Sequence, residues 1–257
     1  MLTFVGLGLY DERSVTVRGA AAIAAADRCF AEFYTSRLVG TDVETLAATH
    51  DVHVEVRDRA GVEEDPEPIL SAAAGGEAVF CTAGDPMIST THVDLRLRAV
   101  DRGIDTRVIH GTTAQTAASS LTGLQNYRFG KATTLPFEGT HGTSGVPESV
   151  VETVTGNRER DLHTLVYLDI DPRRDAYMRG ADAAGLLRDA GLDGLGVVVG
   201  QAGSDEPTVR ADRLSTLADG DFGPPLHLLV LPGSLHALEA DALERLAGAP
   251  AELLPER

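Results

Sequence analysis

Two short loops in the first half of the chain carry residue types that bind small ligands in α/β proteins. Gly6 and Gly8 follow the apolar segment 2–5, and glycines at such a turn let a ligand approach the backbone closely. A dinucleotide fingerprint requires a third glycine at position 11, but the sequence has Asp11, whose carboxylate repels a pyrophosphate. The first loop therefore argues against NAD-dependent oxidoreduction. A tight turn that needs glycine torsions is the alternative.

The second loop is Gly84-Asp85-Pro86, which comes soon after the apolar segment 78–81. Open α/β sheets bind ligands outside the carboxyl ends of their strands. Asp85 is therefore placed to accept a hydrogen bond from a ligand amine or to balance a positive charge. The alternative is an ordinary Asp-Pro turn whose side chain accepts from nearby backbone amides. The residues alone leave both interpretations open.

These loops connect predicted strands to predicted helices. Short apolar segments recur between longer helical ones along the chain, which predicts alternating strands and helices. Strands separated by helices predict parallel βαβ units with right-handed crossovers. Strands are expected at residues 2–5, 29–34, 52–56, 78–81, 107–110, 164–170, 196–200 and 227–231. Helices are expected at residues 14–27, 42–49, 66–74, 90–102, 181–190 and 235–247, with others after residues 113 and 148.

Residues 129–147 are rich in glycine and proline and predict a loop and linker. The whole chain of 257 residues suits two domains of about 120 residues each. The predicted fold class is thus α/β, with two α/β domains at residues 1–135 and 136–257 and parallel or mixed sheets.

The charge balance predicts an unusual environment. The formal net charge is −17, and Lys131 is the single lysine against 21 arginines. Many carboxylates with almost no lysine are typical of proteins in concentrated salt, where self-repulsion is screened to about 3 Å at 1 M. Ordinary acidity with arginine-rich codon usage is the alternative. Strong acidity also argues against nucleic-acid binding, which needs clustered cations.

Other features predict a cytoplasmic enzyme without a metal. No apolar run approaches the roughly 20 residues of a membrane span, and residues 1–10 lack the basic cluster of a signal peptide. Cys29 and Cys81 give neither a disulfide framework nor metal-ligand spacing, and both are expected to be buried.

Several segments together resemble the diphthine synthases, a branch of the tetrapyrrole-methylase-like (class III) methyltransferases. Gly-Leu-Gly and Gly-Asp-Pro are common to class III enzymes, whereas Glu-Phe-Tyr-Thr-Ser at 32–36 and the complete opening at 6–13 are much narrower. The resemblance covers nearly the whole chain and is weakest at about 139–160 and 173–190. The matching segments are residues 6–13, 31–36, 84–86, 89–92, 162–165, 168–170, 225–227 and 231–236.

The sequence departs from the family before Gly84, where relatives usually carry a proline and this chain has Ala83. We expect this difference to alter the rigidity of the turn. The segment 141–148 is short and glycine-rich, so no substrate contact is assigned there.

The resemblance implies a homodimer that binds S-adenosylmethionine in a cleft between the two domains and releases S-adenosylhomocysteine. Asp85 is expected to hold the amino-acid end or the ribose of the cofactor. An anion beside the sulfonium would stabilise the ground state more than the transition state, in which that charge is being lost. Carried over position by position, the implied cofactor contacts are Leu9, Asp85, Ile88, Thr113, Ala114, Leu168, Ala202 and His227.

The implied substrate is translation elongation factor 2 bearing a 3-amino-3-carboxypropyl group on a histidine, whose amine is trimethylated to diphthine in diphthamide biosynthesis. The amine must be neutral to attack. His92, His110 and His163 are conceivable bases, with capping or packing as the alternative for each, and water between rounds is another conceivable acceptor, so no catalytic residue is assigned. Two other hypotheses remain: a class III methyltransferase acting on a free tetrapyrrole such as a precorrin, and a non-catalytic metabolite-binding protein on the same scaffold.

Overall fold

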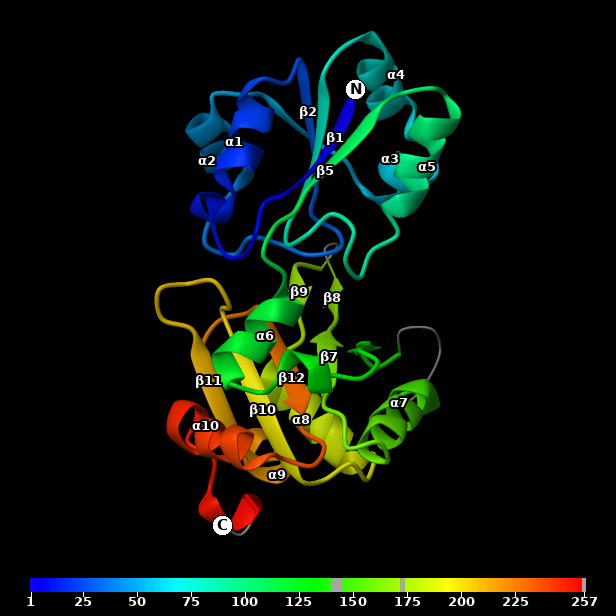
Figure 1. Cartoon of the computed structure of the whole chain (residues 1–257). Helices are drawn as coiled ribbons and strands as arrows, with labels where there is room; N and C mark the ends of the chain where they lie inside the picture. Colours follow the sequence, from blue (N-terminus) through cyan, green and yellow to red (C-terminus); the bar gives the residue numbers. More distant parts are fainter. Residues whose placement is uncertain (140–144, 172–173, 256–257) are drawn as a thin grey trace. The chain divides into compact units, whose positions relative to one another are not determined.

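The computed structural model describes residues 1–139, 145–171 and 174–255. The chain forms two compact units, Met1–Thr113 and Ala114–Arg257, each built around one five-stranded sheet (Figure 1). The predicted class of two α/β domains with parallel and mixed sheets is confirmed. Residues 140–144 of the expected loop lie outside the described residues. Among the described residues, no helix combines the length and apolar character needed to cross a membrane.

The boundary between the units follows Thr113, whereas the sequence analysis placed it near residue 135. Helix α6 (Ala114–Thr122) and strand β6 (Thr133–Leu135) therefore belong to the second unit, where β6 pairs with β7 (Thr164–Leu168). Glycine and proline marked a loop inside the second unit, because composition reports where the backbone turns and not which core a strand joins.

The first unit has a fully parallel sheet with strand order β3-β2-β4-β1-β5. Figure 1 shows α1 and α2 on one face and α3, α4 and α5 on the other. Its strands are β1 (Leu2–Gly6), β2 (Arg28–Glu32), β3 (Val54–Val56), β4 (Ala78–Thr82) and β5 (Thr106–Ile109). Its helices are α1 (Val17–Ala24), α2 (Val43–His50), α3 (Arg59–Glu63), α4 (Glu67–Gly75) and α5 (Val93–Asp101), with a 3-10 turn η1 at Glu12–Ser14.

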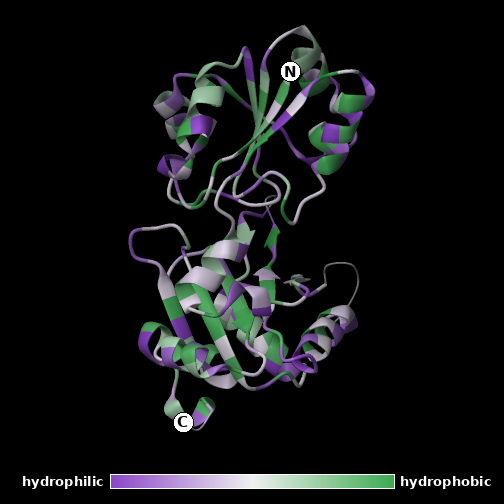
Figure 2. Ribbon diagram, in the orientation of Figure 1, coloured by the Kyte–Doolittle hydropathy of each residue, from purple (hydrophilic) through white to green (hydrophobic). Residues whose placement is uncertain are grey.

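Alternate residues of the parallel strands build two cores, as the two-residue period of a strand requires. Phe4 and Phe80 pack with the helices α4 and α5, while Val5 and Val79 pack with α1 and α2. A strand buried on both faces reads as a continuous apolar run, which explains why β1 and β4 were clear in the sequence. The apolar centre of the sheet is visible in Figure 2.

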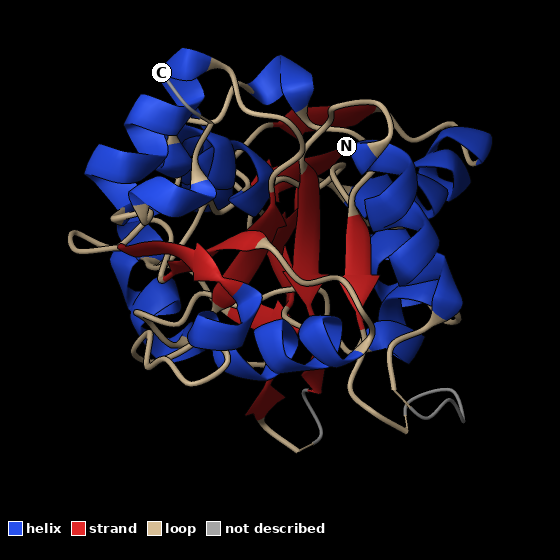
Figure 3. Ribbon diagram, turned by 90° about the horizontal axis from the view of Figure 1, so that it is seen from below, coloured by secondary structure: helices blue, strands red, loops and turns tan. Residues whose placement is uncertain are grey.

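The second unit has a mixed sheet with strand order β11-β10-β12-β7-β6. Strand β12 is antiparallel to both β10 and β7, so β10 and β7 run in the same direction. Helices line both faces of the sheet (Figure 3). The remaining elements are η2 (Asn126–Arg128), α7 (Glu148–Arg158), β8 (Ile170–Asp171), β9 (Ala176–Tyr177), α8 (Gly180–Asp189), β10 (Leu195–Gly200), β11 (Thr208–Arg213), α9 (Leu214–Leu217), β12 (His227–Leu231), α10 (Ala237–Ala247) and η4 (Ala251–Leu253).

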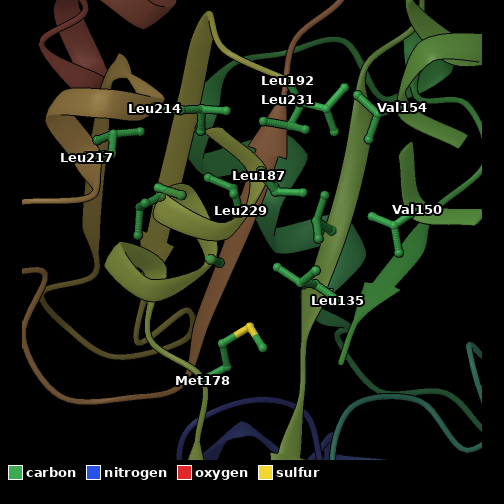
Figure 4. Close-up of a cluster of buried hydrophobic side chains, with 14 of the residues drawn as sticks. Leu135, Val150, Val154, Met178, Leu187, Leu192, Leu214, Leu217, Leu229 and Leu231 are labelled. Atoms are coloured by element: carbon green, nitrogen blue, oxygen red, sulfur yellow. The ribbon is translucent and has the colours of Figure 1, made fainter. Parts of the chain in front are cut away.

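The two faces of this sheet bury separate sets of side chains. Figure 4 shows one of them, in which Leu229 and Leu231 of β12 meet Leu187 of α8 and Val154 of α7. The other set joins Leu228 and Val230 with the helices α6 and α10.

Some local expectations differ from the structure. The predicted helix 14–27 is only α1, because residues 12–14 form the 3-10 turn η1 instead. The predicted strand 164–170 ends at Leu168, where the carboxylate of Asp169 accepts a hydrogen bond from the Phe137 amide. Strand β11 was not expected, because it is an edge strand rich in charged residues and gives little apolar signal.

Candidate functional site

The first unit contains a topological switch point between two neighbouring strands. The chain leaves β1 toward α1 on one face of the sheet and leaves β4 toward α5 on the opposite face. Loops that diverge in this way leave a crevice at the carboxyl ends of the strands, where open α/β sheets bind ligands. Both loops singled out in the sequence lie at this point.

Two glycines, Gly6 and Gly111, let these loops touch through their backbones. A Cβ atom on Gly6 would lie 2.5 Å from the amide nitrogen of Gly111 and 2.5 Å from the carbonyl oxygen of Gly84, and one on Gly111 would collide with that same oxygen. Gly84 also donates to the Gly8 carbonyl at 2.7 Å. The glycines thus bring the loops after β1, β4 and β5 together, which a side chain would prevent.

Asp85 joins two of these loops and is buried. Its Oδ1 accepts from the Met87 amide at 2.9 Å, as in an Asp-Pro turn. Its Oδ2 lies 2.8 Å from Nδ1 of His110 and accepts from the Gly111 amide at 3.3 Å. The turn interpretation is therefore correct for Oδ1, while Oδ2 bonds to a histidine that the sequence analysis did not connect with it.

His110 differs from the other two histidines considered as bases. Its side chain is 77 % exposed, whereas His92 and His163 are buried. A carboxylate only accepts hydrogen bonds, so Nδ1 of His110 carries a proton toward Asp85, and in the neutral imidazole Nε2 keeps its lone pair. His110 is thus the one member of this trio that can meet a substrate.

The Glu-Phe-Tyr-Thr-Ser segment forms a turn organised by a buried carboxylate. Glu32 accepts from the amides of Tyr34 and Thr35 at 3.0 Å each, from the Thr35 hydroxyl, and from the Thr82 hydroxyl at 2.5 Å. These bonds fasten the end of β2 to the end of β4. Burial and the negative charge of Glu32 raise the pKa of Tyr34, so its phenol stays neutral.

His92 supports the same turn from the other side. Its Nδ1 lies 3.3 Å from the Pro86 carbonyl and its Nε2 lies 3.5 Å from the Glu32 carboxylate. Burial lowers the pKa of His92, while Glu32 and the carbonyl act in the opposite direction. With both nitrogens facing the protein interior, His92 holds the loop and is not accessible to a substrate.

In the second unit, three of the implied cofactor residues lie at the same end of neighbouring strands. Leu168 ends β7, Ala202 follows β10, and His227 begins the antiparallel β12 between them. Ala114 is the first residue of α6, which packs on the face of this sheet. Leu9, Asp85, Ile88 and Thr113 belong to the first unit, where they all follow carboxyl ends of its strands.

His227 has one nitrogen in use and one without a partner. Nδ1 accepts from the amide of Gly180, the first residue of α8, at 2.9 Å, so Nε2 carries the proton. Among the described residues, this buried Nε2 has no hydrogen-bond partner. Burial lowers the pKa of His227, against the effect of neighbouring carbonyls, and the ring is therefore a neutral donor. A ligand acceptor in good geometry would therefore complete the hydrogen bonding of this donor.

His163 lies at the opposite end of these strands, just before β7 begins. Its Nε2 is 3.0 Å from Glu239, and its Nδ1 accepts from the Gly233 amide at 3.1 Å. Glu239 also accepts from Arg128 at 2.5 Å and from the Gln125 amide at 2.9 Å. The family segments at 162–170 and 225–236 thus meet in a buried polar network that ties α10 to the sheet.

Sequence reasoning missed the partners in these networks. Asp85 and His110 are 25 residues apart, and Glu239 is 76 residues from His163, so no local pattern joins them. Gly111 carried a signal that was available, since a glycine directly after a strand often marks close backbone approach. Across the described residues there is no group of three metal-ligating side chains.

Residues 1–218 match the family described as Tetrapyrrole (Corrin/Porphyrin) Methylases. The chain therefore belongs to the tetrapyrrole methylases. Within them it is similar to the diphthine synthase of Halobacterium salinarum, with 70 % identity over 99 % of this chain and 100 % of the relative. The diphthine synthase of Haloarcula marismortui is 68 % identical over 98 % of this chain and 100 % of its own length. The resemblance to diphthine synthases is confirmed.

Solved structures agree with this assignment. A crystal structure of diphthine synthase matches with a TM-score of 0.91 and 38 % identity, covering 98 % of both chains. A putative diphthine synthase from Entamoeba histolytica matches with a TM-score of 0.84 and 29 % identity, covering 97 % of this chain and 99 % of the other. The fold described above is thus a methyltransferase fold.

Proposed function

We propose that this protein uses S-adenosylmethionine to trimethylate the amine of 3-amino-3-carboxypropyl-histidine on translation elongation factor 2, which gives diphthine. The observation that carries the proposal is 70 % identity to a diphthine synthase over 99 % of the chain. That similarity covers both units.

The residues present suit the cofactor. The glycine-lined switch point of the first unit offers backbone groups and an apolar side chain, Ile88, that is 46 % exposed. In the second unit, the unpaired Nε2–H of His227 suits a nitrogen or hydroxyl oxygen of an adenosine, and Ala202 leaves room beside it. We propose that the cofactor is held by Leu9, Asp85, Ile88, Thr113, Ala114, Leu168, Ala202 and His227.

The bound cofactor would supply an electrophilic methyl group on a positively charged sulfur. The protein then has to orient the acceptor amine in line with that methyl and exclude competing water, an effect worth up to about 7–11 kcal/mol when alignment is ideal. Because Asp85 already accepts three hydrogen bonds from its own unit, we propose that it orients this loop and offers its remaining lone pair to the cofactor's amino-acid end or ribose.

We further propose a cytoplasmic homodimer adapted to concentrated salt. The net charge of −17 and the halophilic relatives support the salt adaptation. Light scattering measures the molar mass of the protein and so tests the dimer. It is done in roughly 2–3 M KCl, where carboxylate repulsion is screened. A monomeric mass would reject it.

The decisive experiment incubates the protein in high salt with labelled S-adenosylmethionine and elongation factor 2 bearing the aminocarboxypropyl-histidine. Mass spectrometry of the modified peptide should show a gain of three methyl groups. A bound cofactor with no methyl gain on this protein would reject the substrate. Methylation of a free precorrin instead would favour the tetrapyrrole hypothesis, and binding without turnover on either acceptor would favour a metabolite-binding protein.

A further inference from the structure

We propose that His110 is the catalytic proton acceptor of the methyl transfer, held in its reactive tautomer by Asp85. This inference rests on the proposed function, because it assigns a role within that same site. It is carried by two observations: the hydrogen bond of 2.8 Å between Nδ1 and Asp85, and the 77 % exposure of the His110 side chain.

The tautomer follows from the contact. Because the carboxylate takes the proton on Nδ1, Nε2 has its lone pair available and lies on the exposed side of the ring. Asp85 itself is fixed by the Met87 and Gly111 amides, so the histidine is anchored to a rigid turn. Among the described residues, Asp85 is the charged group within ion-pair distance of His110. An imidazolium formed on His110 would therefore be stabilised directly.

The position of His110 also suits the reaction. It follows β5, bonds to Asp85 in the loop after β4, and precedes Thr113 by three residues in the chain. Asp85 and Thr113 are both proposed cofactor contacts. A proton acceptor is thus placed beside the residues that would hold the methyl donor, at the carboxyl edge of the first sheet.

The chemistry needs such an acceptor in each round. An aliphatic amine with a pKa of roughly 8–10 is an ammonium at neutral pH and cannot attack. Its N–H bond breaks, the proton moves to Nε2 of His110, and the electron pair stays on nitrogen. That pair forms the new N–CH3 bond while the S–CH3 pair returns to sulfur. His110 then releases the proton to solvent. Three rounds transfer three methyl groups and release three protons, leaving the quaternary ammonium.

His110→Asn is the informative variant. The amide nitrogen of asparagine occupies the position of Nδ1, so it keeps the hydrogen bond to Asp85 but offers no base at the position of Nε2. We expect the dissociation constant for S-adenosylhomocysteine, measured by calorimetry, to change by less than about 3-fold. The rate of methyl transfer should fall about 100-fold, at the lower end of general-base effects. His53→Asn, at an exposed histidine outside the site, is the matched control and should stay within about 2-fold.

Three further readouts separate a base from a merely structural residue. Raising the pH should speed the His110→Asn variant more than the wild type, because only the variant relies on solvent to deprotonate the amine. Added imidazole should restore turnover to His110→Gly. In the free protein, nitrogen NMR should show His110 with its proton on Nδ1.

The opposite results would overturn the proposal. His110→Asn turning over at the wild-type rate with the wild-type pH profile would show that water takes the proton. Loss of S-adenosylhomocysteine affinity by the same factor as the rate would make His110 a cofactor contact instead. If wild-type protein binds the cofactor but does not methylate elongation factor 2, the proposed substrate fails, and this role of His110 fails with it.

Discussion

Each unit contains a histidine hydrogen-bonded to a buried carboxylate. The two pairs differ in whether the second ring nitrogen of the histidine is accessible. His110 bonds to Asp85 through Nδ1 and is exposed, while His163 bonds to Glu239 through Nε2 and is completely buried. The second nitrogen of His163 is occupied by the Gly233 amide. The same two functional groups thus give a reactive arrangement in one unit and a closed structural one in the other.

The comparison shows that a histidine–carboxylate contact is no sign of catalysis by itself. The deciding property is whether the other ring nitrogen can reach a ligand. The location of the His110 pair also favours ligand binding, because it lies at the carboxyl ends of parallel strands, where such folds bind ligands. The His163 pair lies at the edge opposite to Leu168 and His227. Variants should therefore separate the two pairs, one affecting turnover and the other affecting stability.

Glu239→Ala should have the largest effect on stability. It would leave the donors of Arg128, His163 and two backbone amides without their acceptor, and breaking a buried ionic network costs about 3–5 kcal/mol. Denaturant unfolding in high salt measures the loss. Glu239→Gln keeps the shape and should lose less. Methyl transfer by the protein that remains folded should be unchanged, and a large loss of kcat there would contradict the structural role.

Gly111→Ala should damage the exposed pair. The added methyl group would collide with the Gly84 carbonyl and push the Gly111 amide away from Asp85. Overpacking of this kind costs about 1–3 kcal/mol, so we expect cofactor affinity to fall about 10-fold or more. Calorimetry with S-adenosylhomocysteine measures this, with Gly75→Ala, which has open space, as the control. Equal affinities for the two variants would show that the loop contact is unimportant.

The buried pair should also give the protein a pH-dependent stability. Burial lowers the pKa of His163 below its ordinary value of 6.5, against the opposing effect of Glu239. The neutral histidine therefore stabilises the fold above pH 6.5, and this contribution is lost as the pH falls below that value. His163→Asn should reduce the slope of unfolding free energy against pH, by at most about 1.4 kcal/mol per pH unit. Identical slopes between pH 7 and 5 would contradict this assignment.

Gly156→Ala should have the smallest effect and the opposite sign. Gly156 lies inside α7, and a Cβ atom added there would meet open space, so alanine should stabilise the helix by about 0.5–1 kcal/mol. Thermal unfolding measures the gain. Turnover should be unaffected, because α7 takes no part in either pair. A changed rate would show that the stability of the second unit influences turnover.

Much of the fold could be predicted from local sequence patterns. The doubly buried strands β1, β4, β10 and β12 appear as short apolar runs, and the glycine and Gly-Asp-Pro loops mark strand ends. The short or charged strands could not be predicted. β6 has only three residues, and β11 is rich in charged residues and lies at the edge of its sheet. The unit boundary was also misplaced, since α6 and β6 join the second core through contacts with distant residues.

The sequence by itself determined the family, the α/β class and the loops that hold the candidate site, because these depend on residue types at short spacing. Only the tertiary structure decided which histidine is paired, exposed and available. His92, His110 and His163 were equivalent in the sequence, and their partners lie in the loop after β4 or on helix α10. Burial and hydrogen bonding are properties of the folded surroundings, and these properties leave His110 exposed and bury His92 and His163.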